Sequence, residues 1–519
     1  MNFRSIPARR ALATGLCLIL SISPAGLTPG LAQNLPNLGD ESETVLSPQM
    51  ERRIGESYFR ELRRDFTYLD DPELKAYVEQ LGAQLIAAGP DSGLEVEFFV
   101  MKDASINAFA MLGGFIGINT GLLQAAQSES EAASVVAHEL GHLTQKHIAR
   151  SVSAGRRSSI VSMVAMALAL LAARSNGQVA AGAITGAQAF QVQSQLAYSR
   201  DFEREADRVG FDILQKAGFD VSAMPAFFER LQRAGRAYDS NAPVYVRSHP
   251  LTTERIADVR NRAQDARYRQ RADSLSFHLV RAKLRAGADS SVDSVRDALR
   301  FFAAQLADKT YANEVAARYG HAEALLQSRD FKGAAAALAA LPKSAVHPMI
   351  EALAARVRLG SGDTAGAVSV LRAAILKYPQ ARHLQTALAE ALQGSNAHVE
   401  ALEVLAELSR QNRNDPKIHE MQARSYAATG RVLAQHQSLG EYYALVSGPQ
   451  AAMEQFQIAR CAGGGDFYQQ SILDSRIRAM WDRVLAERAD RGEGEKGGVP
   501  AAGAGRLPVL PQQMPARCP

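Results

Sequence analysis

Hydrophobic positions recur at helical spacing along most of the chain, with one short exception near residue 100. Two early helices are predicted over Glu51–Arg63 and Pro72–Ala88, where apolar residues return every three or four positions. Asp70-Asp71-Pro72 is a start signal for the second helix. Polar and apolar residues instead alternate over Leu94–Val100, and Phe115–Asn119 follows a Gly-Gly turn, so both segments are predicted to be strands.

From about residue 269 the sequence becomes a series of Ala/Leu-rich helices with a period near 34 residues. Similar segments begin at Asp330, Asp363 and Asn396. Prolines close helices between them, at Pro342, Pro379 and Pro416. This period is typical of tetratricopeptide repeats, whose helix pairs stack into a superhelix with a concave surface. We expect that surface to dock proteins or peptides; a spacer role is the alternative.

These patterns predict an α+β, mainly helical chain with two folded regions. Residues 33–268 form the first region with its small sheet, residues 269–490 form an α-solenoid, and residues 491–519, rich in Gly, Pro and Ala, form a disordered tail. Residues 1–32 have the features of a secretory signal peptide, because three arginines precede a short apolar run and small residues precede Gln33. Such a signal predicts export to the periplasm.

The net charge limits the kinds of molecule that the protein can bind, and the cysteine content limits the disulfides that it can form. The formal net charge of +4 falls to +1 (4 − 3) once Arg4, Arg9 and Arg10 leave with the signal peptide, which is too little for nucleic-acid binding. The apolar run is short for a membrane anchor, so membrane association is expected to be peripheral at most. Cys461 and Cys518 remain, and whether they form a disulfide is left open.

The strongest chemical signal is His138-Glu139-Leu140-Gly141-His142. On a helix, residues at i and i+4 lie on one face, so both imidazoles can reach one zinc ion while Glu139 acts as the general base on a water molecule. A surface helix with two histidines is the alternative. Catalytic zinc usually takes three protein ligands and keeps one position for water, so a third ligand is required.

The helix predicted around residues 200–214 is the best source of that ligand. Glu203 and Asp207 lie along the edge of its apolar stripe, one turn apart, whereas Glu205 faces away. Glu203 is predicted to be the third metal ligand, and Asp207 to accept the free N–H of a ligand histidine. In the alternative interpretation the acidic residues pair with the arginines of the same helix, Arg200, Arg204 and Arg208.

Together these motifs resemble peptidase family M48, the HtpX-like and CAAX-prenyl-protease-like gluzincins. The resemblance rests on the two histidines with Glu139, on Glu203–Asp207, on the segment Asn107–Ala110 leading into Gly113–Ile118, and on Ser248-His249-Pro250. It covers roughly residues 50–265. The repeats that follow are similar to those of the periplasmic branch of the family, the β-barrel assembly-enhancing proteases.

The resemblance implies a gluzincin-type metalloprotease with one Zn²⁺ per chain, bound by His138, His142 and Glu203. It implies polypeptide substrates, namely misfolded or stalled outer-membrane proteins, and the β-barrel assembly machinery as a partner. Before Pro250, His249 is expected in an extended or turn segment, where it would either stabilise the oxyanion or occupy the open zinc position. Gly113–Ile118 would either hold substrate along a sheet edge or form an ordinary core hairpin.

Two questions stay open at this stage. Ile160–Ala173 is too short to cross a bilayer, and it is interpreted as a lid over the site, a buried core helix or a helix at a membrane surface. The alternative function is a periplasmic chaperone or scaffold whose peptidase site is largely latent. Retention of Glu139, which a structural zinc site would not need, favours the enzyme.

Overall fold

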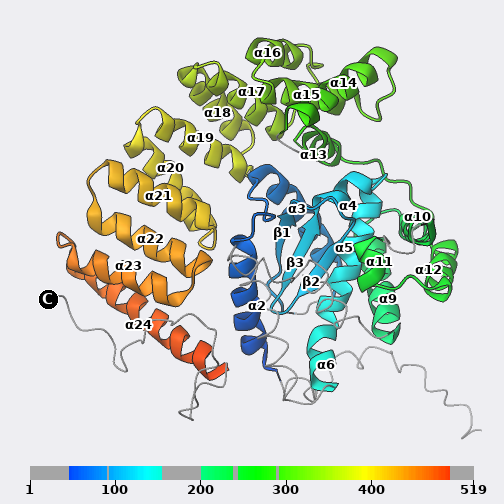
Figure 1. Ribbon diagram of the computed structural model, residues 1–519, viewed down its shortest axis with the longest axis horizontal. Coiled ribbons are helices and arrows are strands. Elements are labelled where there is room, and N and C mark those ends of the chain that lie inside the picture. The colour runs from blue at the N-terminus through cyan, green and yellow to red at the C-terminus, as the bar shows by residue number, and fades with distance from the viewer. Residues whose placement is uncertain (1–45, 91–92, 155–199, 238–242, 288–290, 491–519) are drawn as a thin grey trace, which may run out of the picture.

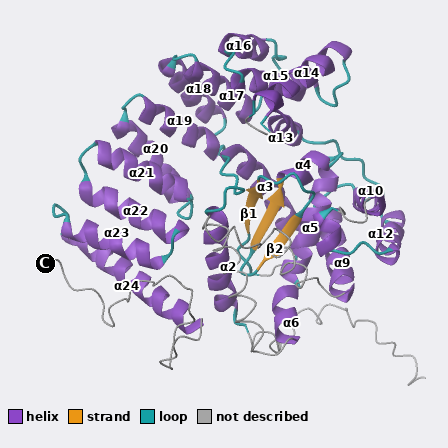
Figure 2. Ribbon diagram, viewed as in Figure 1, coloured by secondary structure: helices purple, strands orange, loops and turns teal. Residues whose placement is uncertain are grey.

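The structure, a computed structural model, describes residues 46–90, 93–154, 200–237, 243–287 and 291–490. Figures 1 and 2 show three strands enclosed by helices, with an arc of further helices beside them. The predicted signal peptide (1–32), the segment Ile160–Ala173 and the predicted tail (491–519) lie outside the described residues. None of the helices in the described ranges is both long and apolar enough to cross a membrane.

The N-terminal region contains all three described strands. Its elements are α2 (Pro48–Arg63), α3 (Pro72–Ala88), β1 (Glu97–Met101), β2 (Ala108–Met111), β3 (Phe115–Asn119), α4 (Thr120–Ala125), α5 (Glu129–Thr144), α6 (His147–Ala154), α9 (Arg200–Lys216), α10 (Ala223–Ala237), α11 (Val244–Ser248) and α12 (Thr253–Asp265). The predicted helix Pro72–Ala88 is confirmed, with Asp71 as its N-cap. The first helix begins at Pro48, three residues before the prediction, because Ser47 caps it.

The strands form one sheet in the order β1-β3-β2, with β3 parallel to β1 and antiparallel to β2. Alternate side chains of β1 point to opposite faces, as the pleat requires. Phe99 and Met101 pack with Phe59 of α2, whereas Phe98 and Val100 join the larger core with α3 and α5. Burial on both faces explains why the sheet is so short and apolar.

The sequence pattern predicted β1 and β3 but not β2. β2 has only four residues, and three of them are partly exposed, so its alternation is too brief to be recognised. Gly113 and Gly114 form the tight turn before β3 with φ of 77° and 91°, a conformation that favours glycine. A Cβ at Gly114 would lie 2.2 Å from the carbonyl oxygen of Glu95, so the close approach of backbones also requires glycine.

The C-terminal region is entirely helical over the residues described. Its helices are α13 (Leu275–Ala286), α14 (Val292–Asp308), α15 (Glu314–Gln327), α16 (Phe331–Ala339), α17 (Pro348–Gly360), α18 (Thr364–Lys377), α19 (Arg382–Gly394), α20 (His398–Gln411), α21 (Pro416–Ala428), α22 (Val432–Val446), α23 (Pro449–Cys461) and α24 (Phe467–Asp490). The predicted repeat starts are helix starts: Asp330 and Asp363 cap α16 and α18 by accepting from the backbone N–H of Gly333 and Gly366. Cys461 is disulfide-bonded, and Cys518, whose pairing with it the sequence left open, lies outside the described residues.

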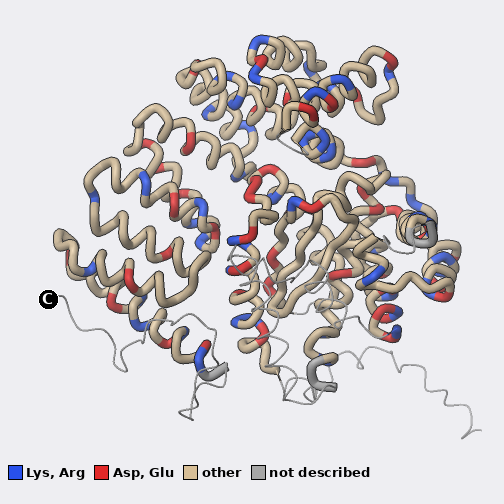
Figure 3. Tube along the Cα trace, viewed as in Figure 1, with Lys and Arg blue, Asp and Glu red and all other residues tan. Residues whose placement is uncertain are grey.

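Figure 1 shows helices α13–α24 curving around the N-terminal region until α24 lies near α2. Ion pairs join the two regions in the middle of this arc and at its C-terminal end. Arg60 of α2 pairs with Glu487 of α24 at 2.7 Å, and Arg382 of α19 pairs with Glu79 of α3 at 2.6 Å. Figure 3 shows basic and acidic residues interspersed along the elements that meet there.

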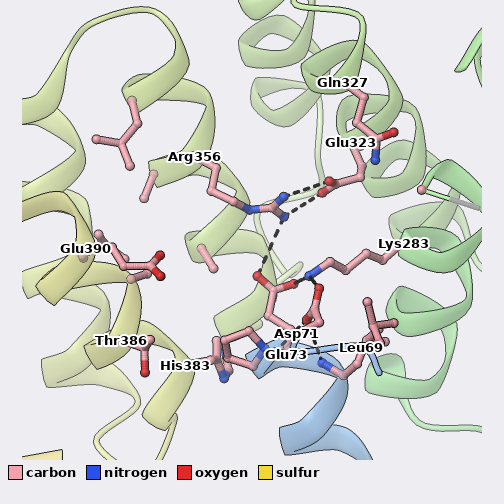
Figure 4. A pocket seen from close by; sticks show the side chains of 18 of the residues that line it. Leu69, Asp71, Glu73, Lys283, Glu323, Gln327, Arg356, His383, Thr386 and Glu390 are labelled. Carbon is pink, nitrogen blue, oxygen red and sulfur yellow. Dashed lines mark hydrogen bonds and ion pairs between the residues drawn. The ribbon is translucent and has the colours of Figure 1, made fainter. Parts of the chain in front are cut away.

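The start of α3 also meets α13, α15, α17 and α19 around a cavity of about 350 Å³ that is lined by both charged and apolar side chains. Lys283 contacts Asp71 at 2.6 Å and Glu73 at 2.8 Å, and Arg356 contacts Glu323 through two hydrogen bonds (Figure 4). This paired network fixes the first repeat helices against the N-terminal region.

Candidate metal centre

Helix α5 places His138 and His142 on one face, as the i, i+4 spacing predicts. Their Nε2 atoms lie 3.0 Å apart, and both side chains are buried. The helix begins at Ser128, whose hydroxyl accepts from the N–H of Glu131, and acidic residues occupy its first turn. These local signals are favourable for a helix start. The surface-helix alternative is therefore wrong, because nearly all of α5 is buried.

Helix α9 crosses α5 closely enough to bring Glu203 to the two histidines. Glu203 Oε1 lies 3.4 Å from His142 Nε2, and Oε2 lies 3.5 Å from His138 Nε2. Two glycines permit this crossing. A Cβ on Gly210 would lie 2.9 Å from His138 Cα, and one on Gly141 would lie 2.8 Å from the carbonyl oxygen of Ala206.

His249 completes the cluster from the end of α11. Its backbone leaves the helix with φ −125° and ψ 82°, which is outside the helical region that proline disfavours for the residue before it. Its Nδ1 atom lies 3.0 Å from Glu203 Oε1 and 3.5 Å from His138 Nε2. One donor atom from each of His138, His142, Glu203 and His249 therefore lies within 4.8 Å of the others, and all four residues are buried.

Glu139 faces the same space from α5. Its Oε2 accepts a hydrogen bond of 3.0 Å from the N–H of Ala110 on β2. Its Oε1 is buried without a hydrogen-bond partner in the described part of the chain, and it lies 3.5 Å from His249 Nε2. Burial raises the pKa of Glu139, which makes the carboxylate a better proton acceptor. A buried acceptor with one open oxygen suits a general base.

A buried salt bridge supports the ligand residues from behind. Asp207 Oδ1 lies 2.9 Å from His138 Nδ1, and Arg255 of α12 holds both Asp207 oxygens at 2.7 and 2.8 Å. Arg255 also lies 2.7 Å from Glu203 Oε2. Glu203 and Asp207, the acidic residues of α9 that were predicted to take part in the site, thus contact Arg255 and the histidines. Arg204 of the same helix pairs with Asp201 and Glu254. The alternative of pairing within the helix is wrong for Glu203 and Asp207.

The charges in the cluster depend on one another. Burial alone would raise the pKa of Glu203, but the charge of His249 and hydrogen bonds from the histidines hold it well below its usual range. Burial would lower the pKa of His138, but Asp207 and Glu203 raise it to about 9. Burial lowers the pKa of His142 well below its ordinary value despite Glu203. The site therefore holds an ionised carboxylate beside imidazoles.

This donor set fits a metal ion. Three imidazole nitrogens and one carboxylate are the ligand types that zinc takes in proteins. The Nε2 atoms of His138 and His142 lie only 3.0 Å apart and both face the carboxylate of Glu203, so one shared cation would satisfy all three groups. An ionised carboxylate beside imidazole lone pairs makes the cluster a poor match for an anion and a good match for one divalent cation.

Two residues that contact the cluster side chains were not recognised from the sequence. Arg255 lies on a separate helix, and only its position five residues after Pro250 links it to the predicted motifs. His147 lies five residues after His142, with its Nδ1 atom 2.9 Å from His142 Nδ1. The i+5 spacing is not a helical-face spacing, so the periodicity did not indicate this contact.

The suggested substrate edge was assigned to the wrong strand. β3 lies between β1 and β2 and all its residues are buried, so Gly113–Ile118 belongs to a core hairpin, the alternative that the sequence left open. Among the described strands, the one at the sheet edge beside the cluster is β2, whose residue Ala110 contacts Glu139.

Comparison with known proteins agrees with this architecture. Residues 70–263 match peptidase family M48 and residues 358–425 match a tetratricopeptide repeat. The Beta-barrel assembly-enhancing protease of Escherichia coli K12 is 30% identical over 91% of this chain and 96% of its own length. The Putative beta-barrel assembly-enhancing protease of Vibrio cholerae is 40% identical, and the matched part covers 54% of this chain and 59% of that relative.

A more distant relative extends the comparison beyond bacteria. A mitochondrial metalloendopeptidase of Schizosaccharomyces pombe is 27% identical over 41% of this chain. The buried cluster, the helical repeats and the near full-length match to the Escherichia coli protease lead to one conclusion. The chain belongs to peptidase family M48 and is a repeat-bearing metalloprotease related to the β-barrel assembly-enhancing proteases.

Proposed function

We propose that this metalloprotease is a zinc-dependent endopeptidase of the periplasm that hydrolyses misfolded or stalled outer-membrane polypeptides. The observation that carries the proposal is the buried cluster of His138, His142, Glu203 and His249 with Glu139 facing it. The predicted signal peptide and the relatives named for β-barrel assembly support the location and the substrate class. The repeat helices would dock substrates or the β-barrel assembly machinery.

His138, His142 and Glu203 would hold the zinc ion, one per chain. A zinc ion bound there would polarise the scissile carbonyl and acidify the attacking water. Glu139 would take the proton from that water through Oε1 and return it to the leaving amine, while Ala110 holds its other oxygen. Asp207, fixed by Arg255, would keep His138 in the tautomer that presents Nε2 to the metal.

The edge of β2 is the best candidate for holding substrate. An extended polypeptide can add to a free strand edge through main-chain hydrogen bonds, which recognise an unfolded chain rather than a particular sequence. Because Ala110 of β2 contacts Glu139, a chain on this edge would run past the general base. Such recognition suits an enzyme that acts on misfolded proteins.

A second candidate function is a chaperone or scaffold whose peptidase site is largely latent. The position of His249 favours it, because a fourth protein donor beside the three ligands would fill the place that water needs. Both functions place zinc at the same residues, so they differ in how often His249 leaves the site.

The test compares residues 33–519 with the Glu139→Gln variant on an unfolded test protein, with zinc content measured on both. We expect about one zinc in each and a loss of roughly 10²- to 10⁴-fold in cleavage rate for the variant, the usual contribution of a general base. Asp212→Asn, an exposed acidic residue on α9, is the matched control and should cleave normally.

If both proteins bind zinc and neither cleaves, the latent-site function takes precedence. If the wild-type chain binds no zinc, the assignment of the metal fails.

A further inference from the structure

Behind His142, the chain turns sharply and brings a third histidine of the same segment into contact with it. Helix α5 ends at Thr144, and Lys146 adopts the left-handed conformation with φ 51° before α6 begins at His147. This turn is sealed by the hydrogen bond from the N–H of Lys146 to the carbonyl of Leu143, 3.1 Å long. It directs the imidazole of His147, which is fully buried, back under His142.

Both ring nitrogens of His147 have a partner. Nδ1 lies 2.9 Å from His142 Nδ1, and Nε2 lies 3.1 Å from Glu205 Oε2. Arg150 contacts the same oxygen of Glu205 at 2.9 Å. The ring of Phe202 stacks on His147 at 4.5 Å with planes 10° apart. Contacts of its two nitrogens and stacking on Phe202 therefore fix the orientation of the His147 ring.

The order of hydrogen bonds follows from the proposed function. If His142 presents Nε2 to the metal, its Nδ1 must carry the proton and can only donate. His147 must then accept through Nδ1, which leaves its proton on Nε2 to be donated to the carboxylate of Glu205. Burial lowers the pKa of His147, in keeping with the neutral ring that this order requires. The opposite tautomer would put two N–H groups face to face.

The two metal histidines are thus supported in different ways. His138 meets a carboxylate directly, Asp207, which Arg255 clamps in the interior. His142 meets a neutral imidazole, and the carboxylate lies one step farther out at Glu205, which is partly exposed. A carboxylate that was expected to face away from the site on α9 therefore acts on it through His147.

We propose, on the basis of the proposed zinc function, that His147 is a positioning residue that fixes the tautomer and orientation of His142, with Glu205 and Arg150 fixing His147 in turn. The zinc affinity of the chain then depends on the hydrogen-bond acceptor at His147 Nδ1, and not only on the volume of the ring. Outer hydrogen-bond partners of this kind typically change metal affinity by about 10- to 100-fold.

The test measures zinc affinity by competition with a chelator, and zinc release after chelator addition, on residues 33–519. His147→Leu keeps an apolar body against Phe202 but removes both nitrogens, and should weaken zinc binding by about 10- to 100-fold. His147→Asn places a carbonyl oxygen near the position of Nδ1 and should restore most of that loss. Glu205→Leu should weaken binding less than His147→Leu, and Arg204→Gln, an exposed neighbour on α9, should bind as the wild type does.

Thermal unfolding of the metal-free proteins separates positioning from folding. The proposal expects the Leu and Asn variants to unfold at similar temperatures without metal and to differ only in zinc binding. Equal zinc affinity in the wild type and in His147→Leu would overturn the proposal, and so would Leu and Asn variants that are weakened equally. A wild-type chain that binds no zinc would instead refute the proposed function.

Discussion

At the residue scale, we propose that His249 decides whether the metal site is open or closed at rest. Its Nδ1 atom lies among the predicted metal donors and its Nε2 atom faces Glu139. It therefore lies beside both the predicted metal ligands and the predicted general base. Where the chain leaves α11, the N–H of His249 donates to the carbonyl of Tyr245. A side chain at the end of a five-residue helix can be displaced at lower cost than one in the middle of α5.

Replacement of His249 by Ala tests whether it closes the site. If His249 fills the open position in most molecules, the variant should cleave an unfolded protein about tenfold faster or more, because a minor open state becomes the major one. If His249 stabilises the oxyanion, cleavage should fall instead. The measurement is the initial cleavage rate at matched zinc content, with His321→Ala as the histidine control. An unchanged rate would exclude both roles.

At the scale of elements, the site is made by the crossing of α5 and α9. Neither helix contains a complete ligand set, and the two approach so closely that glycine is required on both sides, at Gly141 and Gly210. The N–H of Ala110 on β2 adds the third element by holding Glu139. The sheet, the metal helix and the Glu203 helix therefore behave as one rigid unit.

Gly210→Ala should separate α9 from α5. The added Cβ would lie 2.9 Å from both the Cα and the N of His138, and a helix backbone cannot yield as a side chain can. We expect a loss of about 1–3 kcal/mol in the free energy of unfolding, as for other overpacked interiors, together with weaker zinc binding. Chemical denaturation and chelator competition measure the two effects.

The control is Gly394→Ala at the end of α19, where an added Cβ meets nothing within 4 Å. It should be neutral or slightly stabilising, because alanine favours a helix over glycine. If Gly210→Ala has the same stability and zinc affinity as the wild type, α5 and α9 can move apart without cost and the prediction is wrong.

At the scale of the whole molecule, the first repeat helices share one buried hydrophobic core with the N-terminal region, and pairs of charged groups also join the two regions. The network around Arg356 and Lys283 lies at the start of the arc, and ion pairs of α19 and α24 with α3 and α2 lie farther along it (Figure 4). Burial would raise the pKa of Glu323, but Arg356 lowers it below its ordinary value. The junction thus depends on paired charges remaining paired.

Arg356→Met should destabilise the chain by leaving Glu323 without its cation. Glu323 is 3% exposed, whereas about a third of the Arg356 side chain is exposed. We therefore expect the free energy of unfolding to fall by about 2–3 kcal/mol. This is at or below the lower end of the range for breaking a fully buried ion pair. Denaturant unfolding of residues 33–519 is the measurement.

The double variant Arg356→Met with Glu323→Leu serves as the internal control. It should recover much of the loss, because no unpaired charge remains in the interior. Equal stability of the single and double variants would contradict the importance of this pair.

The sequence alone determined the properties that depend on neighbours along the chain. The i, i+4 spacing of His138 and His142 placed both on one helix face, and Asp71 and Pro72 located the start of α3 correctly. The period of the C-terminal region revealed its helical repeats, and two of the three predicted starts, Asp330 and Asp363, are helix caps, whereas α20 after Asn396 begins without a side-chain cap. Glu203 and Asp207 were identified for the same reason, since they share one edge of one helix.

Only the tertiary structure decided which elements meet. The position of β2 at the sheet edge, the clamp of Arg255 on Asp207, and the contact of His147 with His142 all join segments whose approach no local periodicity encodes. The first and last of these depend on turns with positive φ, at Gly113 and Lys146, and the clamp depends on the packing of α12 against α9. Local spacing is set by the geometry of one helix or strand, whereas these contacts are set by how several elements pack together in three dimensions.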